Sequence, residues 1–538
     1  MSADTPAEGG VLTGTWALIR LILRRDRIRV PVWILSIVAF TVSFLPAMPD
    51  LYPDQQALDG RAALMENPAT IAMTGPGFGV DDYTFGAMVA NEYLGYVAIL
   101  VALMSVFLVV RHTRAEEETG RAELVRAGVV GRYAPLTAAV SVVLAANLVI
   151  ALLLIALMPP ALPELDVAGT ALFAASAAGT GLVFTGVGAV VAQLTYAARG
   201  ATGLGLATLA VAYLLRAIGD AGDLPALSWS SPIGWTQQTA SYVDDTWWPL
   251  ALSVGATVAT LWIAVLLSRR RDVGLGLFAP RKGSARAGVS LSGPIGLAWR
   301  LQRGTVIAWS VGLAVFGLVY GSIAPEIEKF ANENPFVSEA ISQEGTSLTE
   351  GFFGMVVMMF SMLAIGFVLQ SVLRARGEES AGRAEPLLAR PVSRARFLVG
   401  HVIIAAVVGP LLSYIATLSM GLSASASLGD WSMLPDLVLA ATVYIPAIWI
   451  FVGIAVALFG LLPRLTALVW ATLVYVVVVN MLGIFLQLPD WMMEASPLSH
   501  IPRVPADDVT AAPLLTMTAI AVVLLTAGFV GFRRRDLA

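Results

Sequence analysis

Twelve apolar stretches separated by short polar segments dominate the pattern of this 538-residue chain. Each stretch is long enough to cross a hydrocarbon core of about 30 Å as a helix, which takes about 20 residues. The first six lie at roughly 30–48, 94–112, 134–158, 168–191, 200–217 and 249–267, and the second six at roughly 305–323, 351–372, 397–421, 436–460, 465–486 and 512–531. The pattern predicts an all-α membrane protein of about 12 transmembrane helices.

A charged stretch between the second and third apolar runs recurs in the second half of the chain. Arg111–Arg132 reads RHTRAEEETGRAELVRAGVVGR, and Leu373–Arg394 reads LRARGEESAGRAEPLLARPVSR. At a constant offset of 262, ten of the 22 positions are identical. Such agreement between charged segments inside apolar sequence indicates a tandem duplication, with two repeats of six spans each.

The duplication extends to both ends of each half. The pattern Arg-x-x-Arg-x-x-Val-x-x-Trp begins at Arg24 and again at Arg300, and Arg-Arg-Arg-Asp begins at Arg269 and again at Arg533. Spacing of three places the first pattern on one helical face, so we expect a short helix at the inner surface before each first span. The predicted domains are a first repeat at 1–272, a basic, Gly- and Ser-rich linker at 273–293 and a second repeat at 294–538.

Composition excludes several classes of protein. With 57% hydrophobic and 13% charged residues, the chain is too apolar for a soluble globular protein. It has no cysteine, and its three histidines lie far apart in sequence, so we expect no disulfide, metal site or cofactor in this chain. The phosphate-binding pattern G-x-x-x-x-G-K-[ST] is absent from the sequence, so we expect no nucleotide hydrolysis by this chain. Nucleic acid is not an expected partner.

The distribution of Lys and Arg over the loops predicts the orientation of the chain in the membrane. If the loops alternate sides, all but four of the 33 Lys and Arg residues fall on one side. The positive-inside rule then places both termini and both charged stretches in the cytoplasm. The loop at roughly 49–93 would lie outside, and its Pro, Gly and aromatic residues predict short surface helices rather than a separate domain.

Each charged stretch is predicted to form one amphipathic helix below the membrane. Spacing of i, i+4 and i+7 places three residues of each copy on one face: Glu116, Gly120 and Glu123, and Glu378, Gly382 and Glu385. The pairs Glu117/Arg121 and Glu379/Arg383 are i, i+4 and would add about 0.2–0.5 kcal/mol each. The alternative is a solvated loop whose arginines only set topology. The two matching copies weigh against this alternative, because both carry glutamates that a purely topological role does not require.

The pattern Glu-Glu-x-x-Gly-Arg-x-Glu followed by Ala-x-x-Val-x-Arg resembles the cytoplasmic coupling helix of ABC-2-type transporter permeases, and Ala389–Arg394 resembles the Pro-Val-Ser-Arg ending of that helix. With both halves in one chain, the protein is similar to the double-size permeases of antibiotic and multidrug exporters of the tetronasin-exporter type. The resemblance implies a bacterial plasma-membrane subunit that exports hydrophobic small molecules. It also implies two copies of a cytoplasmic ATPase, which would bind ATP and Mg.

The resemblance implies that twelve residues face the ATPase: Glu116, Glu117, Gly120, Arg121, Glu123 and Arg132 in the first half, and Glu378, Glu379, Gly382, Arg383, Glu385 and Arg394 in the second. The chain departs from the family pattern at two places. Pro386 replaces the leucine expected after the last Glu, and Gly128–Gly131 replaces the Pro-Val-Ser turn. The two contacts are therefore not expected to be equivalent.

Two groups of side chains are candidates for a substrate pathway within the membrane. Tyr213 lies near the outer end of the fifth span and Asn480 near that of the eleventh, which also holds Tyr475, and the resemblance implies that these two spans line the pathway; the alternative is that these polar residues form hydrogen bonds between helices. Four methionines share a stripe on the eighth span and would suit a hydrophobic cavity, although ordinary helix packing is the alternative: Met355, Met358, Met359 and Met362.

Other functions remain open. Lipid or glycolipid export by the same machinery is the main alternative. A proton-coupled carrier is disfavoured, because ionisable groups are nearly absent from the spans. The remaining alternative is a membrane scaffold that transports nothing.

Overall fold

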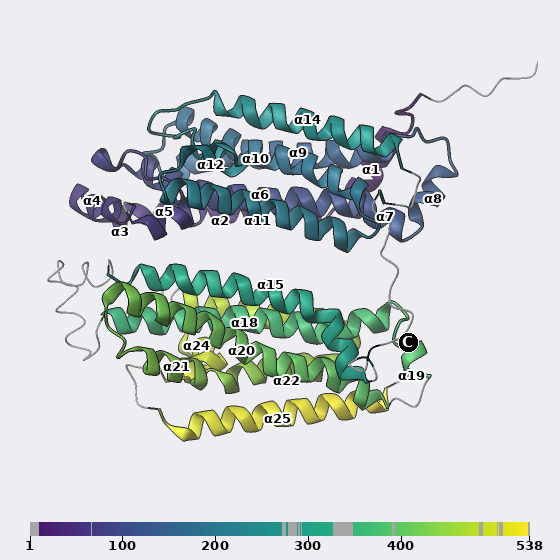
Figure 1. Cartoon of the computed structure of the whole chain (residues 1–538), viewed down its shortest axis with the longest axis vertical. Helices are drawn as coiled ribbons and strands as arrows, with labels where there is room; N and C mark the ends of the chain where they lie inside the picture. Colours follow the sequence, from purple (N-terminus) through teal and green to yellow (C-terminus); the bar gives the residue numbers. More distant parts are fainter. Residues whose placement is uncertain are drawn as a thin grey trace, which may run out of the picture. The chain divides into compact units, whose positions relative to one another are not determined.

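The computed structural model describes residues 10–65, 67–271, 276–277, 288, 291, 293–325, 348–389, 393–483, 488–502, 504 and 509–535. Contacts divide the chain into two compact units, Met1–Lys282 and Gly283–Ala538, which are described separately (Figure 1). The division falls within the predicted linker at 273–293, most of which lies outside the described residues. Arg390, Pro391 and Val392 of the second charged stretch also lie outside them.

Twelve helical segments of the described residues are long and apolar enough to cross a membrane. They are Arg29–Leu51, Phe85–Glu118, Ala134–Ala161, Val167–Leu194, Ala198–Ala221, Pro249–Arg269, Pro294–Ser322, Glu350–Ser380, Arg394–Leu428, Leu434–Leu461, Pro463–Met481 and Ala511–Arg534. No strand occurs in the part of the chain that the structure describes. The predicted all-α membrane fold with twelve spans is therefore confirmed.

The first unit contains six long segments and several short helices. Its elements are α1 (Thr15–Arg25), α2 (Arg29–Val42), η1 (Leu45–Ala47), α3 (Met48–Leu51), α4 (Gln55–Leu64), α5 (Pro68–Thr74), η2 (Val80–Asp82), α6 (Phe85–His112), α7 (Arg114–Glu118), α8 (Arg121–Arg126), α9 (Ala134–Ala161), α10 (Val167–Leu194), α11 (Ala198–Ala221), α12 (Pro225–Trp229), α13 (Pro232–Gln237) and α14 (Pro249–Arg269). The predicted short helices at 49–93 are confirmed by α4, α5 and η2.

The second unit has the same sequence of long helices. Its described elements are α15 (Pro294–Ser322), α18 (Leu348–Ser380), α19 (Glu385–Leu388), α20 (Arg394–Leu428), α21 (Leu434–Val443), α22 (Ile445–Leu461), η4 (Pro463–Leu468), α23 (Val469–Val477), the π-helical η5 (Val478–Leu482), α24 (Asp490–Glu494), η6 (Pro497–His500) and α25 (Ala511–Arg534). In both units the second span packs on the fourth, and the fourth packs on the sixth.

Burial distinguishes the central helices of each unit from its peripheral ones. In the most apolar 18-residue stretch of the spans that contain α6 and α18, 67% is buried inside the protein. The corresponding share is 17% in α14 and α25. Because lipid tails are as apolar as leucine, the exposed apolar surface of α14 and α25 suits contact with lipid. The fourth spans are buried to 67% and 61%, so the second and fourth spans lie at the centre of each unit and the sixth span lies at its periphery.

Glycines allow the helices of the second unit to pack closely. A Cβ added at Gly317 or Gly321 of α15 would lie 2.2 or 2.1 Å from a carbonyl oxygen of α20. A Cβ at Gly460 of α22 would lie 2.0 Å from the carbonyl oxygen of Gly528 on α25. Small residues at such crossings bring helix backbones together, which is a common way to stabilise helix pairs in membranes.

The helix expected before each first span forms separately in only one unit. In the first unit, α1 ends at Arg25 and α2 begins at Arg29, so a short helix does precede the span, but the break falls inside the pattern that begins at Arg24 and was expected on one helical face. In the second unit, α15 runs without a break from Pro294 to Ser322, so the helix that holds Arg300 and Trp309 leads directly into the span instead of forming a separate element. Asp26 at the break corresponds to Gln302 of α15, and Asp favours helix interiors less than Gln does.

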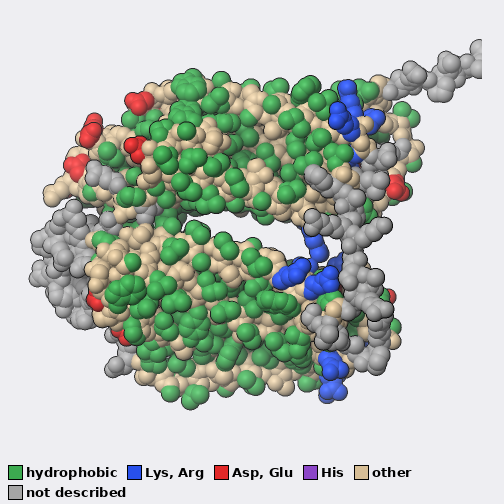
Figure 2. Space-filling view, in the orientation of Figure 1, with side chains coloured by type: hydrophobic (Ala, Val, Ile, Leu, Met, Phe, Trp, Pro, Cys, Tyr) green, Lys and Arg blue, Asp and Glu red, His purple; other side chains and the backbone are tan. Residues whose placement is uncertain are grey.

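Charged side chains separate along each unit. Figure 2 shows that the visible Lys and Arg side chains of each unit gather near the end that holds its charged stretch, whereas the visible Asp and Glu side chains lie mostly near the opposite end. This distribution agrees with the alternation of loops inferred from the sequence. We call these two ends of each unit the arginine-rich end and the acidic end.

Candidate functional site

Each charged stretch folds as an elbow, not as the single amphipathic helix that was predicted. In the first unit, α7 ends at Glu118 and α8 begins at Arg121; in the second, α18 continues to Ser380 and α19 begins at Glu385. The break contains a glycine in the left-handed region, with φ +73° at Gly120 and +68° at Gly382. Left-handed glycine is a common way to end a helix. The i, i+4, i+7 face therefore does not form.

These glycines provide backbone conformation rather than a close approach within the chain. A Cβ added at Gly120 or at Gly382 would meet no described atom within 4 Å. Because a positive φ is costly for residues that carry a Cβ, glycine is required here by the turn itself. The equivalent positions of Gly120 and Gly382 thus mark a repeated turn.

The break also changes the ion pairs, so the predicted Glu117/Arg121 and Glu379/Arg383 pairs are wrong. The Nη1 of Arg121 lies 3.9 Å from Glu116, which is itself 2.5 Å from Arg25. The Nε of Arg383 donates to Glu378 at 2.6 Å. In both elbows, the arginine that follows the glycine pairs with the glutamate five positions before it.

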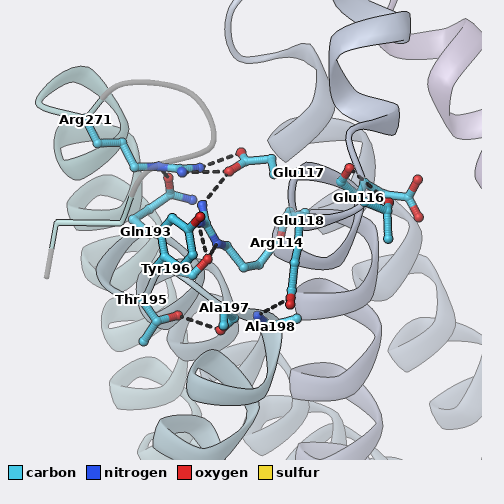
Figure 3. Close-up of polar contacts among 12 residues, drawn as sticks. Arg114, Glu116, Glu117, Glu118, Gln193, Thr195, Tyr196, Ala197, Ala198 and Arg271 are labelled. Atoms are coloured by element: carbon cyan, nitrogen blue, oxygen red, sulfur yellow. Dashed lines mark hydrogen bonds and ion pairs between the residues drawn. The ribbon is translucent and has the colours of Figure 1, made fainter. Parts of the chain in front are cut away.

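The second glutamate of the first elbow binds the end of the last helix. Arg271 donates from Nη1 and Nη2 to the two carboxylate oxygens of Glu117 at 2.7 and 2.6 Å, and from Nε to Gln193 at 2.6 Å (Figure 3). The side chains of Glu117 and Arg271 are 9% and 8% exposed. A bidentate geometry fixes both groups relative to each other.

Two further contacts attach α7 to the turn between α10 and α11. Buried Arg114 donates from Nη1 to Glu117 at 2.7 Å and from Nε to the carbonyl of Tyr196 at 2.8 Å. Glu118 accepts a hydrogen bond from the backbone N–H of Ala198, the first residue of α11, at 2.8 Å (Figure 3). A carboxylate at this position satisfies a free N–H and interacts favourably with the helix dipole.

The second elbow repeats the ion pair. Arg535 donates from Nη2 to Glu379 at 2.6 Å, and the two side chains are 13% and 6% exposed. Its guanidinium also lies over the rings of Phe459 and Phe532, 4.7 and 4.9 Å from their centroids. Arg271 and Arg535 are the third arginines of the two Arg-Arg-Arg-Asp patterns. We call Glu117–Arg271 and Glu379–Arg535 the paired clamps.

The last arginine of each charged stretch contacts the same helix end. Arg132 donates from Nη2 to the carbonyls of Ser268 and Arg269 at 3.0 and 3.2 Å. Arg394 donates from Nη1 to the carbonyls of Arg533 and Arg535. Carbonyls at a helix C-terminus carry partial negative charge, which favours a cation. Each elbow is thus attached at two points to the arginine-rich end of its sixth span.

The tip of each elbow remains exposed. In the first unit, Arg121 and Glu123 are exposed, and so are the apolar side chains of Leu124 and Val129, at 79% and 78%. In the second unit, Arg383, Glu385 and Pro386 are exposed. The residues not predicted from the sequence are Leu124, Val129, Arg271 and Arg535. Part of this could have been read from the sequence, because Leu124 directly follows the last Glu of the repeated charged pattern and both arginines belong to a repeated motif.

A buried carboxylate joins α1 to the second span of the first unit. The Oδ2 of Asp26 lies 3.0 Å from Arg111 and 2.9 Å from the Nε2 of His112. Burial raises the pKa of Asp26, but the hydrogen bond from Arg111 and the nearby positive charges outweigh it, so the pKa lies below its ordinary value of 3.8. In the second unit, neutral Gln302 contacts His401 and Ser371 instead.

The polar pathway candidates contact nearby backbone at the acidic ends of their helices. Tyr213 donates to the carbonyls of Ala72 and Met73 at 3.1 and 3.2 Å, which attaches α5 to α11. Tyr475 donates to the carbonyl of Met492 at 2.5 Å. Asn480, within the π-helical turn, donates to the carbonyl of Val476 and to Ser496, each at 2.8 Å. These hydrogen bonds favour the alternative, in which the three polar side chains hold neighbouring segments together and do not line a substrate pathway.

The four methionines do not share one environment. Met355 is 57% exposed, Met362 is 4% exposed, and Met358 and Met359 are partly buried against the core of the second unit. Their role in a substrate pathway stays a prediction. In the part of the chain that the structure describes, no group of three His, Cys, Asp or Glu side chains could hold a metal ion.

Comparisons with known proteins agree with these features. A family profile described as "Multidrug efflux system permease Rv1217c, C-terminal domain" matches residues 291–533. The chain is 39% identical to "Multidrug efflux system permease protein Rv1217c" of Mycobacterium tuberculosis, over 99% of this chain and 96% of that protein. Because the similarity extends over both six-span units and both elbows, this chain belongs to the family of multidrug efflux system permeases.

Proposed function

We propose that this protein is the membrane subunit of an ATP-driven exporter of the ABC-2 type, similar to the tetronasin exporters, and that it moves hydrophobic small molecules such as drugs out of the cell. Its relative is named a multidrug efflux permease, which supports the cargo class. The chain lacks a phosphate-binding loop motif in its sequence, so the energy would come from two copies of a separate ATPase.

The paired clamps are the observation that carries this proposal. A solvated loop that only sets topology needs no buried ion pair with the end of a transmembrane helix. Here two equivalent glutamates bind two equivalent arginines at 2.6 Å, and each clamp leaves a polar tip exposed beside it. A partner that pulls on the tip would therefore move α14 or α25 together with the elbow, which is how rigid elements transmit a conformational change.

The orientation that fits this role has both termini and both elbows in the cytoplasm of a bacterial cell. The excess of arginine at the arginine-rich ends supports it through the positive-inside rule. The cytoplasm is also where an ATPase finds ATP. Residues Arg121, Glu123 and Leu124 in the first unit, with Arg383 and Glu385 in the second, would form the contact, whereas Glu117 and Glu379 would transmit force behind it.

The experiment replaces the exposed glutamates of both tips. Glu123→Ala with Glu385→Ala should leave the protein in the membrane, because both side chains are exposed. Drug efflux and the ATPase activity that co-purifies with the tagged chain should both fall by about tenfold or more. A matched control removes two exposed carboxylates at the acidic ends, Glu164→Ala with Asp490→Ala, and should change neither.

The outcomes separate the alternatives. Normal efflux and normal co-purification in the Glu123/Glu385 variant would overturn the assignment of the tips. Efflux that persists without any ATPase but stops when the proton gradient is removed would indicate a proton-coupled carrier. Export of labelled lipid with no drug efflux would be compatible with the proposed ATP-driven mechanism but would show that the cargo is lipid and not a drug.

A further inference from the structure

A cavity of about 550 Å³ lies within the first unit at its arginine-rich end. It is bounded by α1, the end of α6, the first elbow, the start of α9 and the end of α14. Its lining includes four leucine or isoleucine side chains, and we call them the apolar wall: Leu18, Leu21, Ile22 and Leu136. Six others are charged, and we call them the charged wall: Arg25, Arg121, Arg132 and Arg271 with Glu116 and Glu117. Such a cavity suits an amphiphile.

The charged wall favours an anion. Both carboxylates are already paired at short distance, Glu116 with Arg25 at 2.5 Å and Glu117 with Arg271 at 2.6 Å. Arg121 reaches Glu116 only at 3.9 Å, and the bonds of Arg132 go to backbone carbonyls, which carry no net charge. Among the described lining residues, two guanidinium charges are therefore not balanced by a carboxylate.

The position of α1 places the cavity at a membrane surface. Ile22 of α1 is buried against Ala138 and Val142 of α9, whereas Trp16 and Leu21 are 64% and 51% exposed. A helix that carries several arginines together with exposed Trp and Leu side chains is typical of the boundary between lipid headgroups and acyl chains. The apolar wall of the cavity then lies toward the acyl chains and the charged wall toward the headgroups.

We infer that this cavity binds a phospholipid with an anionic headgroup from the leaflet that meets the arginine-rich end. The phosphate lies beside Arg121 and Arg132, and the upper part of an acyl chain lies along Leu18, Ile22 and Leu136. Basic pockets between transmembrane helices commonly bind anionic lipid headgroups. The volume lies within the range of about 300–1,000 Å³ that ligand pockets usually have.

The proposed lipid contacts three elements of the first unit. The lining of the cavity includes Glu116 and Ala122 of the elbow together with Ser268 and Arg271 at the end of α14. A bound lipid therefore bridges α1, the elbow and the sixth span, and stabilises their arrangement. Lipid binding here depends on the cavity alone and not on what the protein exports.

The test measures lipid retained by the purified full chain. The protein in neutral detergent is incubated with phosphatidylglycerol or with phosphatidylcholine of the same acyl chains, and bound lipid is counted by native mass spectrometry. Phosphatidylglycerol should be retained about tenfold more than phosphatidylcholine. Arg121→Gln with Arg132→Gln should remove that preference. Inorganic phosphate, which lacks acyl chains, should not raise the thermal unfolding midpoint.

Two further variants keep the test decisive. Arg24→Gln with Arg27→Gln removes two exposed arginines near α1 that do not line the cavity, and it should retain the lipid preference. Leu136→Trp fills the apolar wall without changing charge, and it should lower retention of phosphatidylglycerol. An equal loss in the Arg24/Arg27 control, an unchanged preference in the Arg121/Arg132 variant, normal retention in Leu136→Trp, or equal stabilisation by inorganic phosphate would each overturn the inference.

Discussion

The buried carboxylate of Glu379 has one arginine, Arg535, bound at 2.6 Å, and both groups have little exposure to solvent. Removing one partner of a buried ion pair leaves the other charge without compensation, which typically costs about 3–5 kcal/mol, whereas removing both is far less costly. The effect of this clamp on stability is therefore seen mainly when only one of its two residues is replaced, because the other charge is then buried without a partner. A double-mutant cycle measures that penalty directly.

We expect Glu379→Gln and Arg535→Met each to lower the thermal unfolding midpoint of the detergent-purified protein. The double variant should lose clearly less than the sum of the two single variants, because no unpaired buried charge remains. Arg534→Met removes an exposed neighbouring arginine and serves as the control, with little change expected. Additive losses would show that the two residues do not act as a pair.

Asp26 gives the first unit a predictable response to acid. Its pKa in the folded protein is lowered from 3.8, so its contribution to stability is fully present above about pH 5 and is lost as pH falls through the lowered value. The wild type should therefore unfold at a higher temperature than Asp26→Asn at neutral pH, and this difference should shrink below pH 3.8. A difference that stays constant down to about pH 3 would contradict the assignment.

At the scale of elements, the sequence was sufficient for the spans and insufficient for the elbows. Apolar runs of bilayer length bounded by arginines leave few alternatives to a spanning helix, so α9 and α10 appear where the pattern predicts them, whereas α6 begins at Phe85, nine residues before the predicted start. The i, i+4 spacing of Glu117 and Arg121 is compatible with a helix. However, Gly120 between them is in the left-handed region and ends the helix, so the two side chains no longer lie on one helical face. The partner of Glu117 lies 154 residues away, beyond any local pattern.

Gly120 and Gly382 permit a direct test of this explanation. Gly120→Ala with Gly382→Ala should disfavour the left-handed turn by about 1–2 kcal/mol each, and Gly→Asn at both sites should cost less, because Asn visits that region more readily. No described atom lies near either added Cβ, so steric clashes do not interfere. Hydrogen–deuterium exchange of peptides that cover 114–126 should rise in the Ala variant more than in the Asn variant. Equal exchange in the two variants would argue against a conformational role.

At the scale of the whole molecule, the two units share a plan but present different tips. Leu124 of α8 is 79% exposed in the first unit. In the second unit, Pro386 occupies the corresponding position, and Leu387 and Leu388 pack partly against the core of their own unit. An exposed apolar side chain beside charged groups is typical of an anchor for a partner, because its burial on binding releases water from apolar surface. The first elbow therefore offers an apolar anchor of a kind not found at the described tip of the second.

Leu124→Ser should consequently weaken the association with the ATPase without weakening the fold. The side chain makes little contact within the chain, so the thermal unfolding midpoint of the purified protein should stay within the range of a surface substitution, about 0.5 kcal/mol in stability. Co-purifying ATPase activity should fall by about tenfold, as for the loss of an interface anchor. Leu224→Ser, an exposed leucine at the acidic end, is the matched control. Leu388→Ser should show the opposite result, a lower unfolding midpoint, because that side chain packs against the core. If Leu124→Ser retained full ATPase activity, the anchor would have to lie elsewhere on the elbow.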